Sequence, residues 1–223
     1  MKNCKERFKM KNVLILGANG QIVRIVEKRL IEEQTDTQLT LYLRNSQRLS
    51  DLASDRVKVI EGDANDLDKL KEAMQGQDIV FMGFVDHDKE NTPTKNVIEA
   101  MNDAGVKRIL SSNILGIYDE VPGEFGRWNK EMVSSGLEAA IKADKLLANS
   151  GLDYTTLRFP WLNDRDEVKY DITHKNEEYK GVSGSRQSMA DVVVRMIKDP
   201  EFANNDSIGI ADVDTQGEDR PVY

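Results

Sequence analysis

Residues 12–30 read NVLILGANGQIVRIVEKRL, and the rest of the architecture can be worked out from this stretch. The apolar run at residues 13–16 is typical of a short strand that is buried on both faces of a parallel sheet. Gly17 and Gly20 follow at once and mark a tight turn. The stretch therefore predicts a strand, a glycine turn and a helix, which is the opening unit of an α/β fold. The helix is indicated by apolar residues at the spacing of one helix face: Ile22, Ile25, Val26 and Leu30.

The alternation of strand and helix continues along the chain. Alternating strands and helices are joined by right-handed crossovers and form a parallel sheet. We therefore expect a Rossmann-type, doubly wound parallel sheet with helices on both faces. The further strand-like runs lie at residues 39–43, 57–60, 79–84, 106–110 and 154–157. The further helical patterns lie at residues 67–74, 97–101 and 137–147, with Asn65 or Asp66 as the cap of the first.

The rhythm changes after Pro160. Residues 168–172 alternate like a half-exposed strand, and residues 208–210 indicate a late strand. Ser188 begins a pattern that resembles a capping box, which predicts a last helix ending at Ile197. These late segments are expected to cover the carboxyl edge of the sheet.

No linker divides the chain, so residues 1–223 are predicted to form a single domain. Residues 1–10 are a basic start that we expect to be flexible, and residues 160–223 are expected to cover the substrate side. Residues 113–135 contain glycine and proline and are predicted to form a mobile loop.

The composition is that of a globular protein with a well-charged surface. Acidic residues number 39 and basic residues 31, which gives a formal net charge of −8. An acidic chain does not attract nucleic acid or anionic lipid, so neither is an expected partner. No apolar run approaches the ~18 residues of a membrane-spanning helix. One cysteine excludes an internal disulfide and favours the cytoplasm, and with two histidines we expect no metal site of the zinc type.

The glycine turn is a candidate dinucleotide site. Glycines let the backbone approach a pyrophosphate closely, and the following helix offers free N–H groups and the positive end of its dipole. The spacing is Gly-x-x-Gly rather than the Gly-x-Gly-x-x-Gly of typical dehydrogenases, so an ordinary strand-to-helix turn is the alternative interpretation. The predicted cofactor contacts in this turn are Gly17, Asn19, Gly20, Gln21 and Ile22.

The end of the second strand bears on the choice of nicotinamide cofactor. Folds that bind NAD place Asp or Glu about 20 residues beyond the glycines, to hold the ribose hydroxyls. Residues 41–48 read LYLRNSQR and contain no acid. Arg44 lies where the 2′-phosphate of NADP would be, and its guanidinium suits phosphate; Asn45, Ser46 and Arg48 add donors. The pattern predicts NADP, with NAD as the second choice and a solvated arginine as the alternative.

Several motifs together resemble a known superfamily. They are Gly17-Ala18-Asn19-Gly20, Gly62-Asp63-Ala64-Asn65-Asp66, Ser111-Ser112 and Ser150-Gly151-Leu152-Asp153-Tyr154-Thr155-Thr156-Leu157-Arg158. The chain is similar to the atypical short-chain dehydrogenases/reductases, and more narrowly to the NmrA-like NAD(P)H-binding group. That group includes small flavin and quinone reductases and redox-sensing regulators. The resemblance implies a Rossmann fold and an NAD(P)H cofactor, and it leaves the substrate open.

The chain departs from the pattern of this superfamily at two places. Val23 stands where the family usually has a third small residue, and we expect it to crowd the first helix against the sheet or the pyrophosphate. The Tyr-x-x-x-Lys acid is missing, because the residue four positions before Lys142 is Glu138.

The resemblance also implies roles for residues at the strand ends. The carboxylate of Asp63 would accept from the adenine amino group and Ala64 would offer its backbone N–H; the alternative is that Asp63 helps to cap the next helix. Gly83 would let the ribose pass closely, or would be a plain turn.

The resemblance places the reacting end of the cofactor near the fifth and sixth strands. Ser111 and Ser112 end the predicted fifth strand, and Ser112 is the candidate that orients substrate or nicotinamide; the alternative is a pair of strand-end hydroxyls. Phe159 and Pro160, followed by Trp161, would pack near the nicotinamide, or would be core packing alone.

Two functions of different class remain open. The first is an NADP(H)-dependent oxidoreductase that reduces a small-molecule electron acceptor of quinone or flavin type. The second is a non-catalytic NADP(H)-binding redox sensor that acts through a protein partner. The missing tyrosine favours the sensor, or acceptors whose reduced form needs little help from an acid. The oligomeric state stays open.

Other side chains are candidates of lesser weight. Trp128 and Tyr118 would rim a flat substrate, or tuck against their own loop. If the reaction needs an acid, Tyr118 and His174 are the first to consider. Asp86-His87-Asp88 is interpreted as a charged, solvated turn.

Overall fold

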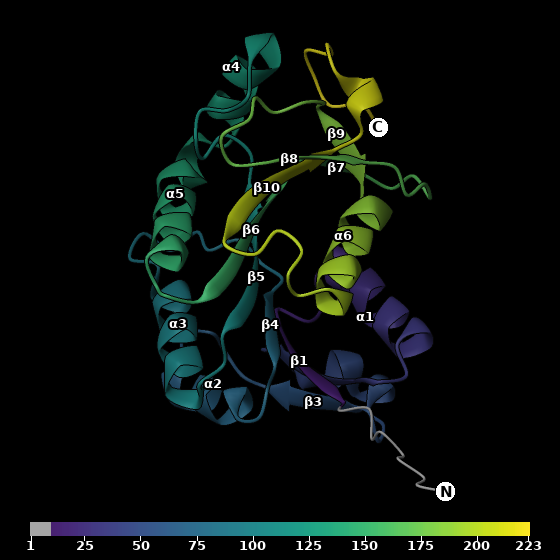
Figure 1. Ribbon diagram of the computed structural model, residues 1–223, viewed down its shortest axis with the longest axis vertical. Helices are drawn as coiled ribbons and strands as arrows, with labels where there is room; N and C mark the ends of the chain where they lie inside the picture. The colour runs from purple at the N-terminus through teal and green to yellow at the C-terminus, as the bar shows by residue number, and fades with distance from the viewer. Residues whose placement is uncertain (1–9) are drawn as a thin grey trace, which may run out of the picture.

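The computed structural model describes residues 10–223, in which one sheet of eight strands runs through the molecule (Figure 1). Its order is β3-β2-β1-β4-β5-β6-β10-β8. Neighbouring strands are parallel, except that β8 is antiparallel to β10. The strands are β1 (Lys11–Leu16), β2 (Thr37–Leu43), β3 (Val57–Glu61), β4 (Ile79–Met82), β5 (Arg108–Ile114), β6 (Asp153–Phe159), β8 (Asp171–Thr173) and β10 (Asp206–Ala211).

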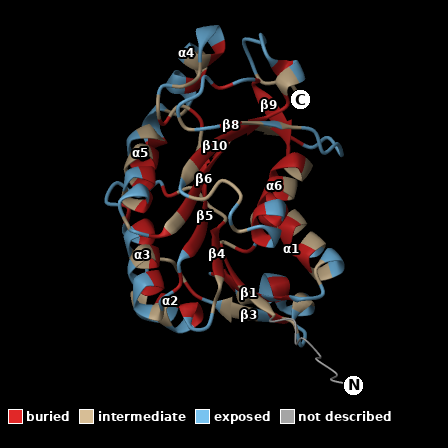
Figure 2. Ribbon diagram, viewed as in Figure 1, coloured by how far each residue is buried: buried red, intermediate tan, exposed pale blue. Residues whose placement is uncertain are grey.

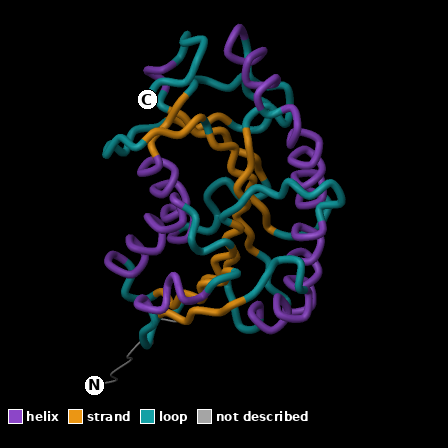
Figure 3. Tube along the Cα trace, turned by 180° about the vertical axis from the view of Figure 1, so that it is seen from behind, coloured by secondary structure: helices purple, strands orange, loops and turns teal. Residues whose placement is uncertain are grey.

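Helices cover both faces of this sheet, which confirms the predicted doubly wound Rossmann fold (Figures 1 and 3). One face is covered by α1 (Gln21–Glu33) and α6 (Arg186–Lys198), and the other by α2 (Leu67–Met74), α3 (Thr92–Ala104) and α5 (Ser134–Ala148). Beyond the carboxyl edge lie α4 (Gly123–Met132) and a small parallel pair of strands, β7 (Trp161–Asn163) and β9 (Ser183–Ser185). Short 3₁₀ helices occur at Ser46–Leu52 and Val213–Thr215.

The period of two along β1 divides its side chains between two cores. Val13 and Ile15 face α1 and α6, while Leu14 and Leu16 face α2, α3 and α5. All four are fully buried, and each contributes roughly 1.5–3 kcal/mol through burial of its apolar side chain. The central strands are accordingly buried over most of their length (Figure 2). No helix in the described part of the chain is both long enough and apolar enough to cross a bilayer.

The prediction of a mobile loop at residues 113–135 was wrong, because α4 forms inside it. Phe125 and Asn129 are buried and anchor this helix. Gly126 looks like a helix breaker in sequence, but a Cβ at this position would overlap the carbonyl of Val121, so the glycine permits close packing. The expected flexible start falls almost wholly on residues 1–9, outside the described residues.

Two predicted element boundaries were also wrong. The strand β5 continues to Ile114, so Ser111 and Ser112 lie inside the strand and are buried, rather than ending it. The last helix begins at Arg186, because the hydroxyl of Ser185 accepts from the backbone N–H of Ser188 at 3.0 Å and caps it.

The late strands do more than cover an edge. Strand β10 joins β6 in parallel register and β8 extends the sheet beyond it, since the inward residues Ile208 and Ile210 complete the core under α6.

Candidate cofactor site

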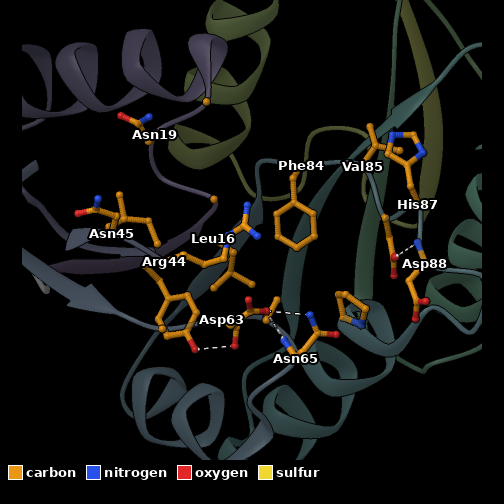
Figure 4. Close-up of a pocket in the computed structure, with 18 of the residues that line it drawn as sticks. Leu16, Asn19, Arg44, Asn45, Asp63, Asn65, Phe84, Val85, His87 and Asp88 are labelled. Atoms are coloured by element: carbon orange, nitrogen blue, oxygen red, sulfur yellow. Dashed lines mark hydrogen bonds between the residues drawn. The ribbon is translucent and has the colours of Figure 1, made fainter. Parts of the chain in front are cut away.

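A pocket of about 560 Å³ opens at the carboxyl ends of β1 to β4 (Figure 4). This edge is the point where the strand order reverses, between β1 and β4, and it is where ligands bind in open α/β sheets. We call it the switch-point pocket. Its lining includes Gly17, Asn19 and Gly20 after β1, Arg44, Asn45 and Arg48 after β2, Asp63, Ala64 and Asn65 after β3, and Phe84, Val85, Asp86 and His87 after β4.

The glycine turn has the geometry that anion binding requires. Gly17 has a φ of +75°, which a residue with a side chain adopts only with strain, and a Cβ there would lie 3.0 Å from Phe84. Gly20 is the N-cap of α1 and has no side chain that could satisfy the first N–H groups of the helix. The first turn of α1 contains no acid. The free N–H groups and the positive end of the helix therefore face the pocket as a site for phosphate.

Val23 packs closely at the end of β4, which is the expected crowding against the sheet, and it is not among the residues that line the pocket. Its side chain is buried and one methyl group fills the space that a Cβ on Gly83 would occupy. A Cβ on Gly20 would still lie 3.4 Å from the same methyl group. Gly83 is thus small because Val23 is large, and Gly83 is not among the residues that line the pocket.

Two arginines give the pocket a cationic end. Arg44 and Arg48 line it after β2, and neither guanidinium group forms an ion pair or hydrogen bond with another residue of the described chain. Ser46, in contrast, is already engaged: its N–H and hydroxyl both donate to Glu61 Oε2, at 3.2 and 3.0 Å. Unpaired guanidinium groups beside a phosphate site are suited to a second phosphate.

Asp63 is oriented as a free acceptor. Its Oδ1 accepts from the backbone N–H and the side-chain amide of Asn65, at 2.9 and 2.8 Å. The backbone N–H of Asn65 holds the pKa of this carboxyl below its usual range. The helix α2 is capped by Asp66, whose Oδ1 accepts from Lys69 N at 3.1 Å, so the capping alternative for Asp63 is wrong. Ala64 lines the pocket beside it.

The remaining predicted cofactor residues lie outside the lining of this pocket. The side chain of Gln21 accepts from Arg186 at 2.9 Å, and Ile22 packs in the core. Ser111 and Ser112 are buried within β5, and Phe159 ends β6 against the core, followed by Pro160. The structure thus brings together Gly17, Asn19, Gly20, Arg44, Asp63 and Ala64.

The aromatic candidates Trp128, Trp161 and Tyr118 contact other side chains of the described chain and do not line the pocket. The rings of Trp128 and Trp161 are in contact, with centroids 4.7 Å apart, and Trp161 Nε1 donates to Asn129 at 2.9 Å. The hydroxyl of Tyr118 donates to Asp144 Oδ2 at 2.6 Å. Burial, with this carboxylate, raises the pKa of Tyr118 far above its usual range, so it is a poor proton donor.

His174 is remote from the pocket as well. Its Nδ1 lies 2.5 Å from Asp206 Oδ2 at the surface of the β8–β10 edge.

Sequence reasoning missed several residues that line the pocket. Tyr42, the residue before the last of β2, donates from its hydroxyl to the Asp63 carbonyl at 2.9 Å. Phe84 forms the central wall (Figure 4). Asp86 and His87 were interpreted as a solvated turn. Asp86 is in fact buried, and His87 lines the pocket. Their position directly after a central parallel strand was the signal that could have found them.

The comparisons with known proteins agree with this geometry. Residues 17–200 match the model of the NAD(P)H-binding family. The chain is 28% identical over 154 residues to "Quinone oxidoreductase 2" of Escherichia coli (strain K12), a match that spans 68% of this chain and about half (49%) of that protein.

Solved structures show the same fold. A Rossmann-fold NAD(P)-binding family protein from Shigella flexneri is 36% identical, with a TM-score of 0.78 over 96% of this chain and 99% of its own. A short-chain dehydrogenase/reductase from Veillonella parvula DSM 2008, solved in complex with NADP, is 24% identical, with a TM-score of 0.85 over 96% of this chain and 99% of its own.

The chain belongs to the NAD(P)H-binding family. The residues of the switch-point pocket fit such a cofactor, because the glycine turn, the unpaired arginines and the free acceptor on Asp63 complement a pyrophosphate, a further phosphate and an amino group.

Proposed function

We propose that this protein is an NADPH-dependent oxidoreductase that reduces a flat, quinone- or flavin-like electron acceptor. The observation that carries the choice of NADPH is the pair of unpaired arginines, Arg44 and Arg48, at the adenosine end of the pocket. A bound nicotinamide supplies the hydride, and the chain positions it. The single cysteine fits a reducing compartment, and we place the reaction in the cytoplasm.

The acceptor class is proposed because the superfamily's tyrosine acid is missing, and an exposed donor or water suffices only where the reduced acceptor is weakly basic. Reduction of an ordinary ketone produces an alkoxide, a strong base that requires a positioned acid. Reduction of a quinone or flavin leaves an aromatic anion that is far less basic. Tyr118 is bound to Asp144, and Glu138 stands where the tyrosine would be. The similarity to a quinone oxidoreductase supports the same acceptor class.

The test is a pair of measurements. NADPH and NADH are titrated against the protein, and oxidation of the preferred cofactor is then followed with small quinones, free flavin and aliphatic ketones. We expect tighter binding of NADPH and faster turnover with a quinone or flavin than with any ketone. Equal binding of both cofactors, or a faster ketone, would contradict the proposal. Tight binding of NADPH without turnover of any acceptor would favour the sensor instead.

A further inference from the structure

His87 borders the switch-point pocket at the end opposite to the arginines. Arg44 follows β2 and His87 follows β4, on either side of β1 and its glycine turn (Figure 4). A dinucleotide with its adenosine phosphate at Arg44 and its pyrophosphate at the turn extends toward β4 and β5. His87 therefore lies on the side of the pocket that the nicotinamide end of the dinucleotide must pass or occupy.

The backbone that carries His87 is held in place. The side chain of Asp86 accepts from the N–H and hydroxyl of Thr94, at 3.1 and 2.6 Å, which ties the segment to the start of α3. Asn91 Nδ2 donates to the carbonyl of Ala139 at 3.1 Å, which ties it to α5. The imidazole thus sits on a fixed support although it is exposed.

The orientation of the ring is set by Gly136. A Cβ on Gly136 would lie 2.7 Å from His87 Nδ1 and 3.1 Å from Cε1, so the Nδ1 edge of the ring faces α5. Nε2 is farther than Nδ1 and Cε1 from the position of that Cβ. Within the described residues, no hydrogen bond or ion pair engages the imidazole. Nε2 therefore has no partner there, on a side chain that lines the pocket.

The other ionisable groups of the lining are not suited to donate a proton. Tyr42 already donates its hydroxyl to the Asp63 carbonyl. Asp63 and Asp86 act as hydrogen-bond acceptors in the structure. Among side chains, imidazole is the one that ordinarily gains and loses its proton near neutral pH.

We propose that His87 is a catalytic residue whose Nε2 donates a proton to the acceptor oxygen during reduction. The proposal rests on the proposed function. A hydride from the bound nicotinamide would add two electrons and one proton to the acceptor. Its electron pair would form the new bond to the acceptor, and a π-electron pair of the acceptor would move onto the oxygen. The N–H bond at Nε2 then breaks as the O–H bond forms. The imidazole is left neutral and regains a proton from solvent, which reaches it because the side chain is exposed.

None of the charged side chains near His87 forms a hydrogen bond or ion pair with its imidazole within the described residues. On its own segment, Asp88 accepts from the Thr92 N–H at 2.8 Å. From α5, Lys142 donates to the Lys89 carbonyl at 3.0 Å, and Glu138 is exposed.

The first experiment observes the histidine directly. The chain contains two histidines, so His87 and His174 give two Hε1 signals in NMR, assigned with His87→Gln and His174→Gln. We expect added NADP⁺ to shift the His87 signal and to leave the His174 signal in place. Binding of NADP⁺ with an unmoved His87 signal would overturn the proposal alone. Failure of NADPH and NADP⁺ to bind would overturn the proposed function and this proposal with it.

The second experiment measures turnover with a quinone. His87→Gln should lower kcat by about tenfold to a hundredfold, the lower part of the range for general acids, because the hydroquinone anion is weakly basic. Its dissociation constant for NADPH should stay within threefold. His174→Gln is the matched control and should keep wild-type kcat.

Gly136→Ala tests the position of the ring without removing it. The added methyl group pushes the imidazole away from α5, and alanine favours the helix, so folding is preserved. We expect a reduced kcat and a displaced His87 signal. Wild-type kcat in His87→Gln, with cofactor binding intact, would overturn the proposal.

Discussion

Arg44 is the residue on which the proposed preference for NADPH chiefly depends. Its guanidinium lines the switch-point pocket and forms no hydrogen bond or ion pair in the described chain, and, together with the backbone N–H of Asn65, its charge helps to lower the pKa of Asp63 in the same pocket. A hydrogen bond to a charged group is worth roughly 1.5–3 kcal/mol. The sequence predicted this residue because no acid follows the second strand, and it predicted Arg48 as a further donor; both arginines line the pocket.

We predict that Arg44→Glu weakens NADPH binding selectively. The loss should be about 10- to 150-fold, from roughly 1.5–3 kcal/mol, while NADH binding stays the same or improves. Fluorescence titration of both cofactors measures it. Lys28→Glu makes the same charge change on an exposed part of α1 and is the control. A parallel loss for NADPH and NADH would mean that Arg44 does not contact the 2′-phosphate.

Glu27 is a buried carboxyl that the proposed reaction does not use. Its side chain is 1% exposed, and Arg24 Nη1 donates to one of its oxygens at 2.8 Å. The other oxygen has no hydrogen-bond partner in the described structure. Burial raises the pKa of Glu27 from 4.5 to about 8, and Arg24 opposes the rise only in part. The folded protein therefore keeps a proton that the unfolded chain releases.

We predict that the protein becomes less stable as the pH rises, because the buried carboxyl of Glu27 must then lose its proton. Between pH 4.5 and about 8 the folded state binds more protons, so the free energy of unfolding falls by up to about 1.4 kcal/mol per pH unit. Glu27→Gln should remove this slope, with little difference near pH 4.5 and greater stability than wild type at pH 8. Urea unfolding across this range measures it, with the exposed Glu32→Gln as control. Parallel pH curves for wild type and Glu27→Gln would contradict the prediction.

At the scale of elements, the sequence predicted the strands and helices that have a clear hydrophobic period, and it missed those that depend on long-range packing. The glycine turn, the parallel strands and most helices follow from local patterns. The ends of β5 could not be predicted, because Ser111, Ser112 and Asn113 are polar yet continue the strand beside β6. Likewise α4 depends on the long-range burial of Phe125. Within the candidate site, the turn and Arg44 were predicted, while the place of His87 was missed because the imidazole packs against Gly136 from a distant helix.

The contact of α1 with the end of β4 is set by a matched pair of residues. Val23 fills the space beside Gly83, and a Cβ on Gly83 would also lie 3.1 Å from the Leu16 carbonyl. We predict that Gly83→Ala destabilises the fold by about 1–3 kcal/mol through overpacking. Val23→Ala should recover part of this loss in the double variant, with a coupling of about 0.5–3 kcal/mol. Urea unfolding of the four proteins measures the coupling, and additive losses would contradict it.

At the scale of the whole molecule, a buried ion pair joins the late segments to the sheet. Arg158 on β6 is fully buried, and its Nη1 donates to Glu120 Oε1 at 2.9 Å. Its Nη2 donates to the carbonyls of Thr173, His174 and Ser207, at 3.2, 3.2 and 3.1 Å. One side chain therefore ties together segments that lie far apart in the sequence, on the side of the sheet away from the arginines of the pocket.

We predict that Glu120→Gln loosens this half of the molecule while the cofactor site persists. Removing one partner of a buried ion pair costs about 3–5 kcal/mol, because the remaining charge stays buried. Glu120 also accepts from the N–H groups of Gly116 and Tyr118, at 3.0 and 2.9 Å. Hydrogen exchange should therefore rise at these two amides and remain slow in β1, and the dissociation constant for NADPH should stay within threefold. Hydrogen exchange that rises equally in β1, or loss of cofactor binding before global unfolding, would contradict the prediction. The two halves would then unfold as one unit, and the Arg158–Glu120 ion pair would support the pocket as much as it supports the late segments.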